Sequence, residues 1–303
     1  MGPIAQVFDV SAETPFSGKQ MVVGWLFAPD DAARKVPQSL VVCLPGGTYS
    51  KSYFHFILDG FTGYSMAEYF VNRGHLVLAL DPLGAGESTR PEEEQMLTRT
   101  VIASIHHAVV KMAIARLADG SAATHLPPVT GLTITGLGHS MGGMLVVTQQ
   151  GRHETYDRIA PLGWVNVPST VVGDVKTFMP PADVPRYIMG SRADKHTIFY
   201  MEDVPEKLIA ADDAAATTIP VTLLSELLSP GISLEEAKQI YVPVFIGFGE
   251  RDMSLNPHLE PSTYPSSTDV TLYILKGSAH CHNFASSRRL LWDRLCNWIE
   301  MSK

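Results

Sequence analysis

The stretch ITGLGHSMGGML, residues 134–145, runs from apolar and β-branched residues into closely placed glycines that surround one serine. Its centre, Gly138-His139-Ser140-Met141-Gly142, has G-x-S-x-G spacing, which marks a nucleophile turn only where a strand precedes it and a helix follows. Such a turn strains the backbone of the serine and presses its flanks against neighbouring backbone, so both flanking positions must be glycine. The alternative is a glycine-rich loop with an unreactive serine, and the surrounding elements decide between the two.

Apolar segments around this stretch alternate with helical patterns. Strands are predicted from apolar and β-branched runs over residues 20–28, 39–44, 75–80, 131–137, 158–165, 241–248 and 270–276. Helices are predicted from periodicity and end signals over 62–73, 98–118 and 286–301, with a further helix after Gly143. This alternation predicts an α/β fold with a mostly parallel sheet and helices on both faces. Ser140 then lies between a strand and a helix, which favours the nucleophile turn.

One interval breaks the alternation. Between Asn166 and Ile240 the strand pattern vanishes, and short helices are expected over 204–215, 218–228 and 233–240. We therefore expect a core over residues 1–166, a helical cap inserted over residues 167–240, and the rest of the core over residues 241–303.

Composition narrows the class of protein. The 303 residues are 45% hydrophobic and carry a formal net charge of -8, which argues against nucleic-acid or anionic-membrane partners. The first residues do not resemble a secretory signal, and no apolar run approaches the roughly 20 residues of a membrane helix. Three widely spaced cysteines suit neither a disulfide framework nor a zinc site. We expect a soluble, cytoplasmic protein with no cofactor or metal, whose oligomeric state, a homodimer included, is left open.

A serine nucleophile needs a base and an orienting carboxylate, in the chain order serine, acid, histidine. Gly249-Glu250-Arg251-Asp252 follows one predicted strand and Gly277-Ser278-Ala279-His280-Cys281-His282 follows the next. Both loops fall at the same edge of the sheet as Ser140. We predict Asp252 as the acid, in preference to Glu250, because its shorter side chain suits a fixed hydrogen bond to imidazole.

Three histidines compete for the role of base. His280 follows a loop of small residues that leaves it free to face the serine, so we predict it as the base. His282 lies closer to the last helix and is expected to be a structural histidine or one at the rim of the site. His139 adjoins the serine on a tight turn, where neighbouring side chains diverge, and is expected to pack and bond to nearby backbone.

Acyl transfer also needs donors for the developing oxyanion. The Met141 amide at the start of the helix after Ser140 is one candidate, helped by the positive end of that helix. The loop Pro45-Gly46-Gly47-Thr48-Tyr49 supplies the other, with Gly47 first and Thr48 next. A phosphate-binding role for these glycines is weak, because neither a Walker lysine nor G-x-G-x-x-G is present.

Taken together, the chain resembles the α/β-hydrolase fold superfamily. The resemblance rests on Pro45-Gly46-Gly47, the turn Asp81-Pro82-Leu83-Gly84-Ala85-Gly86-Glu87-Ser88, the G-x-S-x-G turn, and the loops that carry Asp252 and His280. Pro45 departs from the family, because many members have histidine before these glycines. The resemblance implies a serine hydrolase with a variable cap, and serine in place of aspartate at the turn disfavours dehalogenases and epoxide hydrolases.

The cap and the oxyanion loop contain apolar and aromatic residues suited to a substrate. Candidates for substrate binding are Tyr49, Tyr53, Phe178, Tyr187 and Met189, although each of them could instead pack the cap against the core. We therefore expect the small-molecule substrate to be an apolar or aromatic ester or lactone of small to medium size. The alternatives left open are a carbon-carbon bond hydrolase or thioesterase with the same triad, and a non-catalytic ligand-binding member of the fold.

Overall fold

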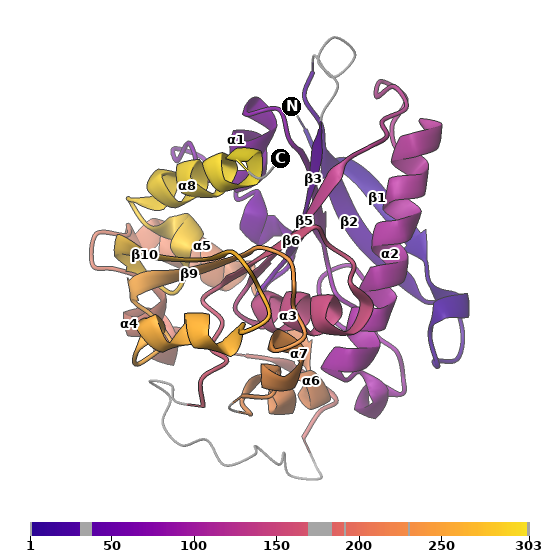
Figure 1. Cartoon of the computed structure of the whole chain (residues 1–303). Coiled ribbons are helices and arrows are strands. Elements are labelled where there is room, and N and C mark those ends of the chain that lie inside the picture. The colour runs from indigo at the N-terminus through magenta and orange to yellow at the C-terminus, as the bar shows by residue number, and fades with distance from the viewer. Residues whose placement is uncertain (1, 31–37, 169–183, 191, 230, 302–303) are drawn as a thin grey trace.

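The computed structural model describes residues 2–30, 38–168, 184–190, 192–229 and 231–301 (Figure 1). Within them, eight strands form one sheet in the order β1-β2-β4-β3-β5-β6-β9-β10. Their bounds are β1 Ile4–Asp9, β2 Met21–Phe27, β3 Ser39–Leu44, β4 Leu76–Leu80, β5 Thr133–His139, β6 Arg158–Leu162, β9 Val244–Arg251 and β10 Val270–Ala279. β1 and β2 are antiparallel to their neighbours, while β4, β3, β5, β6, β9 and β10 run parallel. The predicted α/β fold with a mostly parallel sheet is therefore confirmed.

Helices cover both faces of the sheet (Figure 1). On one face lie α2 (Arg99–Asp119) and α3 (Met141–His153), and on the other lie α1 (Met66–Asn72) and α8 (Arg288–Met301). Alternate residues of β3 divide between two hydrophobic clusters: Leu40, Val42 and Leu44 pack with α2 and α3, and Val41 and Cys43 pack with α1 and α8. A strand buried on both faces reads as a continuous apolar run, which is why SLVVCL was recognisable. Short 3₁₀ helices span Ser11–Glu13, Lys51–Phe54, Glu94–Met96, Ala193–Lys195, Pro257–Thr263 and His282–Phe284.

The carboxyl ends of the parallel strands all point to one edge of the sheet, although β9 continues to Arg251, past the pairing of its Gly247 with Leu162 at the end of β6. Leu44 of β3 pairs with Gly138 of β5, and His139 pairs with Leu162 of β6. At the far side Arg251 of β9 pairs with Ala279 of β10. The loops that follow these strands therefore begin at one edge of the sheet, which is where open α/β sheets place their ligands.

Two strand assignments made from the sequence were incomplete. β1 was not predicted, because its inward side chains include Gln6, whose Nε2 donates to the Ala122 carbonyl at 2.8 Å, whereas Val7 is 45% exposed. At these two positions β1 therefore places a polar side chain, Gln6, toward the core and an apolar one, Val7, toward solvent. The interval from Asn166 to Ile240, where no strand was expected, contains β7 (Tyr187–Met189) and β8 (Thr218–Pro220), an antiparallel pair of three-residue strands too short to leave a pattern.

Residues 167–240 lie between β6 and β9 in the chain and are called the inserted segment below. Besides β7 and β8, its described part contains α4 (His196–Phe199), α5 (Glu206–Ala214), α6 (Val221–Leu227) and α7 (Leu234–Ala237). The three expected helices correspond to α5, α6 and α7. In Figure 1, α6 and α7 lie beneath α3, and α4 and α5 lie on the side of β9 and β10.

A buried polar group fixes the point where the chain leaves β6. Glu260 accepts the backbone N–H groups of Asn166 and Val167 at 2.9 and 3.3 Å, and burial raises the pKa of its carboxyl to about 7. The side-chain oxygen of Asn166 accepts bonds from Trp164 and Ser233. These bonds satisfy polar groups that would otherwise be costly to bury.

Helix α2 was predicted almost to the residue, from Thr98 near its start to Gly120 after its end. Thr98 caps the helix by accepting the N–H of Val101, and Gly120 ends it with a φ of 78°. Among the described residues, this helix alone has the length and hydropathy of a membrane-spanning helix, which was not expected from the sequence, and it packs against α3. His106 is fully buried on α2, and neither ring nitrogen has a hydrogen-bond partner among the described residues.

We predict that His106→Leu stabilises the protein, and more so at pH 5 than at pH 8. Burial lowers the pKa of His106 from 6.5 to about 3, so below pH 6.5 the unfolded chain binds a proton that the folded chain excludes. Stability is therefore lost as the pH falls through this range, in addition to a desolvation cost of about 1–3 kcal/mol for an unpaired polar group. Thermal melting at both pH values measures the difference.

His107→Leu is the matched control, because the half-buried His107 bonds Thr155 through Nδ1 at 2.9 Å. Burial also lowers the pKa of His107, but this variant loses the bond to Thr155 and is therefore expected to gain less stability at pH 5 than His106→Leu. A lower melting temperature for His106→Leu than for the wild type at pH 5 would contradict the prediction.

Candidate active site

The candidate nucleophile occupies a strained turn between β5 and α3. Ser140 has a φ of 54° and a ψ of -117°, a conformation that costs a non-glycine residue about 1–3 kcal/mol. Its N–H donates to the Leu162 carbonyl at 2.7 Å, which ties the turn to β6. A Cβ at Gly138 would lie 2.0 Å from the Gly142 carbonyl oxygen, and one at Gly142 would lie 1.9 Å from the Leu44 carbonyl oxygen. Both flanking positions therefore admit only glycine, as the tight-turn interpretation requires.

His280 and Asp252 form a buried hydrogen-bonded pair. Nδ1 of His280 donates to Oδ1 of Asp252 at 2.6 Å, and the two residues are 1% and 6% exposed. The remaining nitrogen of the neutral imidazole, Nε2, is then the basic one. The backbone of His280 is fixed at both ends, because its N–H donates to the Ile198 carbonyl and its carbonyl accepts His139 Nε2.

Asp252 accepts four hydrogen bonds. Besides His280, the donors are the N–H groups of Gly249 and Met253, at 2.8 and 2.7 Å, and Nε2 of His282 at 2.8 Å. Burial acts to raise the pKa of this carboxyl, but the imidazoles of His280 and His282 outweigh it and hold the pKa well below its ordinary value. Asp252 is therefore a carboxylate across the physiological range. His282 belongs to this group rather than to the rim of the site.

A shift in the pairing of β10 brings the candidate acid and the candidate base together. Leu275 pairs with Gly249, but Ala279 pairs with Arg251, so β10 takes four steps where β9 takes two. Gly277, with a φ of 68°, lies within this irregular stretch. Without the extra residues in β10, regular pairing would place His280 beyond Asp252.

His139 packs beneath the nucleophile turn. Its Nε2 donates to the His280 carbonyl at 2.8 Å, and its ring stacks on Tyr53 with the centroids 4.6 Å apart. Burial, followed by the nearby imidazoles, lowers the pKa of His139 well below its ordinary value, so the ring is neutral. The hydrogen bond to backbone that was expected for His139 is therefore present. Its acceptor is the carbonyl of His280, the candidate base.

The loop after β3 passes close to the candidate nucleophile. A Cβ on Gly46 would lie 3.2 Å from the Cβ of Ser140, and the Tyr49 N–H closes the turn on the Gly46 carbonyl at 3.1 Å. In the described part of the chain, no protein group accepts the backbone N–H of Gly47, Thr48 or Met141. Met141 is only 1% exposed, and a buried N–H without an acceptor is unusual. These amides are available to an oxyanion at Ser140.

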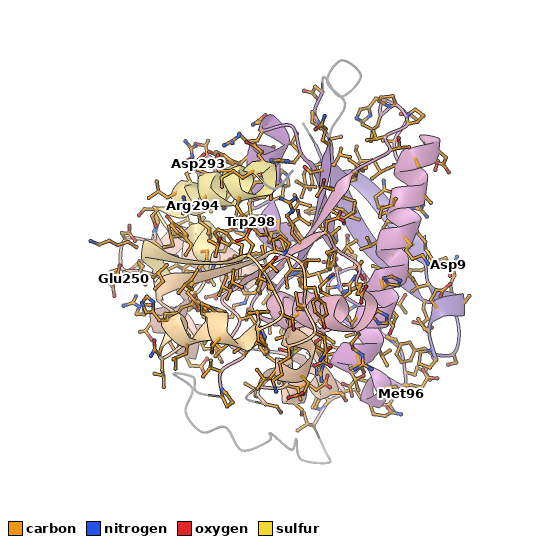
Figure 2. All side chains as sticks on the ribbon, viewed as in Figure 1. Asp9, Met96, Glu250, Asp293, Arg294 and Trp298 are labelled. Carbon is orange, nitrogen blue, oxygen red and sulfur yellow. The ribbon has the colours of Figure 1, made fainter. Side chains whose placement is uncertain are left out.

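The other predicted residues have diverse positions. Glu250 lies at the edge of the molecule and accepts the Gly277 N–H (Figure 2), while the carboxylate bonded to His280 is that of Asp252. Tyr49 and Tyr53 are buried, and the hydroxyl of Tyr187 donates to the Pro91 carbonyl. Met189 is 60% exposed on β7, and Phe178 lies outside the described residues. Their role in substrate binding stays a prediction.

The sequence did not point to a second buried group, which lies beside residues 45–49, the predicted oxyanion loop. Arg192 and Asp212 of the inserted segment form an ion pair at 2.9 Å, each with a side chain only 2% exposed. Asp212 also accepts the hydroxyls of Tyr49 and Tyr200, and the Cys281 thiol contacts the Tyr49 hydroxyl at 3.2 Å. Charged residues scattered through a helical insertion normally indicate solvent-facing helices, so their burial could not have been read from the pattern.

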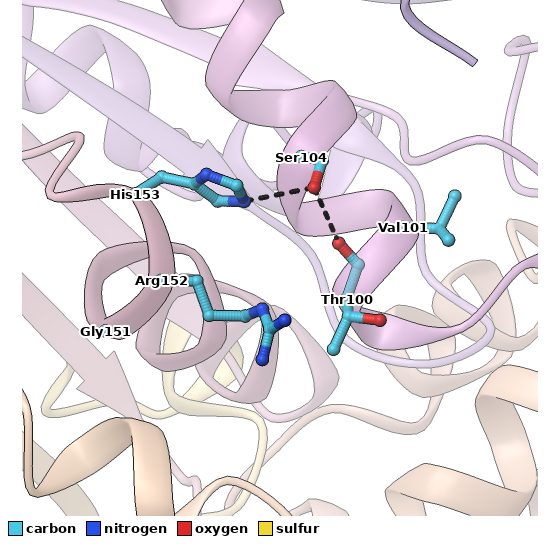
Figure 3. Close-up of a pocket in the computed structure, with 6 residues that line it drawn as sticks. All are labelled: Thr100, Val101, Ser104, Gly151, Arg152 and His153. Atoms are coloured by element: carbon cyan, nitrogen blue, oxygen red, sulfur yellow. Dashed lines mark hydrogen bonds between the residues drawn. The ribbon is translucent and has the colours of Figure 1, made fainter. Parts of the chain in front are cut away.

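A surface pocket of about 400 Å³ lies elsewhere, between the start of α2 and the end of α3 (Figure 3). Ser104 bonds Nε2 of His153 at 3.0 Å, and Arg152 lines the same pocket. Helical rise separates Arg152 from Met141 by about 16 Å along α3, so this pocket is distinct from the Ser140 site. Among the described residues, no group of three or more His, Cys, Asp or Glu side chains is arranged to hold a metal ion.

Comparison with known proteins identifies the family. A model of the alpha/beta hydrolase family matches residues 41–291. The chain therefore belongs to the alpha/beta hydrolase family, which confirms the resemblance inferred from its motifs. No curated protein sequence matches the chain.

Solved structures share the fold along nearly the whole chain. A bromoperoxidase from Bacillus anthracis superposes with a TM-score of 0.66 at 14% identity, over 98% of this chain and 99% of its own. A soluble variant of monoglyceride lipase from Saccharomyces cerevisiae gives 0.65 at 13% identity, over 98% and 95%. An enol-lactonase from Burkholderia xenovorans gives 0.64 at 14% identity, over 93% and 97%. At these identities the likeness shows a common fold.

We predict that Gly163→Ala slows the reaction of Ser140 with a fluorophosphonate probe about a hundredfold. Gly163 has a φ of 61°, and a Cβ there would lie 2.9 Å from Nδ1 and Cε1 of His280, so the imidazole must move. A displacement of about 1 Å in an active site costs a factor of this size. The second-order labelling rate is the measurement.

Gly131→Ala is the matched control, because Gly131 has a similar φ of 69° and nothing within 4 Å of the added Cβ. It carries the same backbone strain without the clash and should label at the wild-type rate. Equal slowing in both variants would attribute the effect to backbone strain and overturn the steric explanation.

Proposed function

We propose that this protein is a serine hydrolase that cleaves carboxylic esters or lactones through an acyl-enzyme on Ser140. The observation that carries the proposal is the buried Asp252–His280 hydrogen bond of 2.6 Å at the sheet edge that carries the strained Ser140 turn. The N–H groups of Met141 and Gly47, which have no acceptor among the described residues, would supply the second requirement of acyl transfer, a site for the oxyanion. Membership in the alpha/beta hydrolase family supports hydrolysis as the reaction class.

In the proposed reaction, Nε2 of His280 takes the proton of the Ser140 hydroxyl while Oγ of Ser140 bonds to the carbonyl carbon of the substrate. The carbonyl oxygen becomes an oxyanion held by the amides of Met141 and Gly47, with Thr48 as a further candidate, each donor contributing about 2.7–4 kcal/mol. The carbon–oxygen bond to the leaving group then breaks, and His280 protonates the departing alkoxide. Water next loses a proton to His280 and attacks the acyl group, which releases the acid and restores Ser140. Asp252 remains ionised and stabilises the imidazolium in both steps.

The inserted segment supports an apolar substrate. A Cβ on Gly47 would lie 3.1 Å from Cδ1 of Ile219 and 3.2 Å from Cδ2 of Leu227, so both side chains lie over the proposed oxyanion loop. Aliphatic groups at this position favour an apolar or aromatic acyl chain over a charged one. The lipase and the enol-lactonase among the structural neighbours are consistent with a small to medium ester or lactone.

The proposal extends to a small-molecule substrate as the principal partner and to a cytoplasmic location. All three cysteines, Cys43, Cys281 and Cys296, are free and buried. Unpaired thiols in a protein of this size are typical of a reducing compartment.

We predict that Ser140→Ala lowers kcat/KM for short-chain and aromatic esters at least about a thousandfold and abolishes fluorophosphonate labelling, because the nucleophile is removed. Turnover is measured on a panel of esters and lactones, with a thioester and a vinylogous 1,5-diketone as further substrates. Ser104→Ala is the matched control, since Ser104 bonds a histidine, His153, but lies in the separate surface pocket.

Ser140-dependent turnover confined to the thioester or the diketone would replace the ester assignment with that alternative. Unchanged hydrolysis and labelling in Ser140→Ala would overturn the proposal. Thermal stabilisation by one of these compounds, without turnover of any of them, would instead support a non-catalytic binding protein.

We also predict that the two histidines on Asp252 differ in their effect on ester hydrolysis. His280→Ala should lower kcat by about 10²–10⁴-fold, as loss of a general base does. His282→Phe should lower kcat only about tenfold, because it removes one of four hydrogen bonds to the Asp252 carboxylate. His282→Gln can still donate to Asp252 and should recover most of that loss, and the reverse ranking of His280 and His282 would contradict the assignment of the base.

A further inference from the structure

Thr48 stands in a backbone conformation that its side chain disfavours. Its φ is 65°, in the left-handed region, and among the described residues outside glycine only Ser140 and Glu154 share a positive φ. A β-branched residue is rarely found there, because its Cβ substituents crowd the backbone. Such a conformation persists only where neighbouring groups hold it in place. Thr48 directly follows Gly47, the first candidate in this loop for an oxyanion donor.

The groups that hold Thr48 come from the inserted segment. Nη2 of Arg192 donates to the Thr48 carbonyl at 2.5 Å, and Nε of Arg192 donates to the Thr48 hydroxyl at 3.2 Å. The Thr217 N–H donates to the same carbonyl at 2.9 Å. The guanidinium also lies 3.6 Å from the ring centroid of Tyr49. Three bonds and a cation–π contact therefore fix Thr48 and the peptide that joins it to Tyr49.

Asp212 in turn fixes Arg192. Nη1 of Arg192 donates to the Asp212 carboxylate at 2.9 Å and to the Asp212 carbonyl at 2.7 Å. The same carboxylate oxygen accepts the hydroxyls of Tyr49 and Tyr200, at 2.7 and 2.5 Å. Arg192 is only 4% exposed, and all three of its guanidinium nitrogens donate to protein acceptors. It is thus built to bind protein groups rather than a substrate carboxylate.

We propose that Arg192, held by Asp212, is a positioning residue that keeps the oxyanion loop in its active conformation. By fixing the Thr48 carbonyl and hydroxyl, it holds the backbone torsions of Thr48. These torsions set the direction of the Thr48 N–H in the preceding peptide and, one peptide further back, of the Gly47 N–H, and so aim both at the oxyanion. The inserted segment then does more than cover the site, because the oxyanion loop keeps its geometry only while the inserted segment is docked against it. This inference rests on the proposed hydrolase function, and its test includes a readout that does not.

The test is a double-mutant cycle between Arg192 and Thr48. Arg192→Met should lower kcat about a hundredfold, near the effect of losing one oxyanion donor, and should change KM by less than about threefold because it does not touch substrate. Thr48→Gly removes the backbone strain, since glycine adopts a positive φ freely. In the Thr48→Gly background, Arg192→Met should therefore cost less than about tenfold.

Two further variants separate positioning from folding. Arg192→Lys keeps the charge beside Asp212 but lacks the planar fork that reaches both Asp212 and Thr48, so its kcat should fall with a melting temperature near that of the wild type. Arg99→Met is the matched control. The Arg99 guanidinium also joins the core to the inserted segment, through Glu236 at 2.8 Å, but it makes no contact with residues 45–49. Arg99→Met should lose stability and retain kcat.

Hydrogen exchange of the backbone amides of residues 46–50 tests the same inference without any substrate. Exchange should be at least about fivefold faster in both Arg192 variants and unchanged in Arg99→Met, because the loop opens when the clamp is lost. Unchanged exchange and unchanged kcat in Arg192→Lys would overturn the inference. So would a loss of kcat on Arg192→Met that is the same in the wild-type background and in the Thr48→Gly background. If the wild type shows no Ser140-dependent turnover or labelling, the proposed function fails, and the exchange rates alone then decide whether Arg192 holds the loop.

Discussion

The candidate site depends on the parallel register of β3, β5, β6, β9 and β10. Leu44 pairs with Gly138 and His139 with Leu162, so the chain leaves β3, β5 and β6 at one level. β9 and β10 run further toward the same edge, past the pairing of Gly247 with Leu162, and end together where Arg251 pairs with Ala279. Ser140, Asp252 and His280 each stand one residue past one of these paired positions. Residues more than 100 positions apart in the chain thereby reach one edge of the sheet without any long loop to be ordered.

Close approach at this edge is possible only because side chains are absent where backbones meet. Gly138 and Gly142 allow α3 to pack against β3 and β5, and Gly163 leaves room for the imidazole of His280. The strain at Ser140 is held by the Leu162 carbonyl and by the first turn of α3. The site therefore combines two strained residues, Ser140 and Thr48, with neighbours that over-determine their conformations, which is the usual arrangement for strain at functional sites.

Much of the fold was predictable because its signals are local. β3 was predicted with its observed bounds, and the start of α2 was readable from Thr98, whose hydroxyl caps the helix. β1 escaped prediction because Gln6 turns inward to a carbonyl far away in the chain. The ends of β9 and β10 were also misjudged, since the strands extend through Glu250 and Gly277, residues whose types do not suggest a strand.

What the sequence by itself determined is the fold class, the turn at Ser140 and the order of the candidate nucleophile, acid and base. These follow from residue types at short spacing, because hydrophobic periodicity and the steric need for glycine act within a few residues. The tertiary structure decided the partners of each group: the shift in β10 that sets His280 against Asp252, the second histidine on that carboxylate, and the bond from Arg192 to Thr48, 144 residues away. Such contacts arise from how whole elements pack, and no spacing along the chain encodes them.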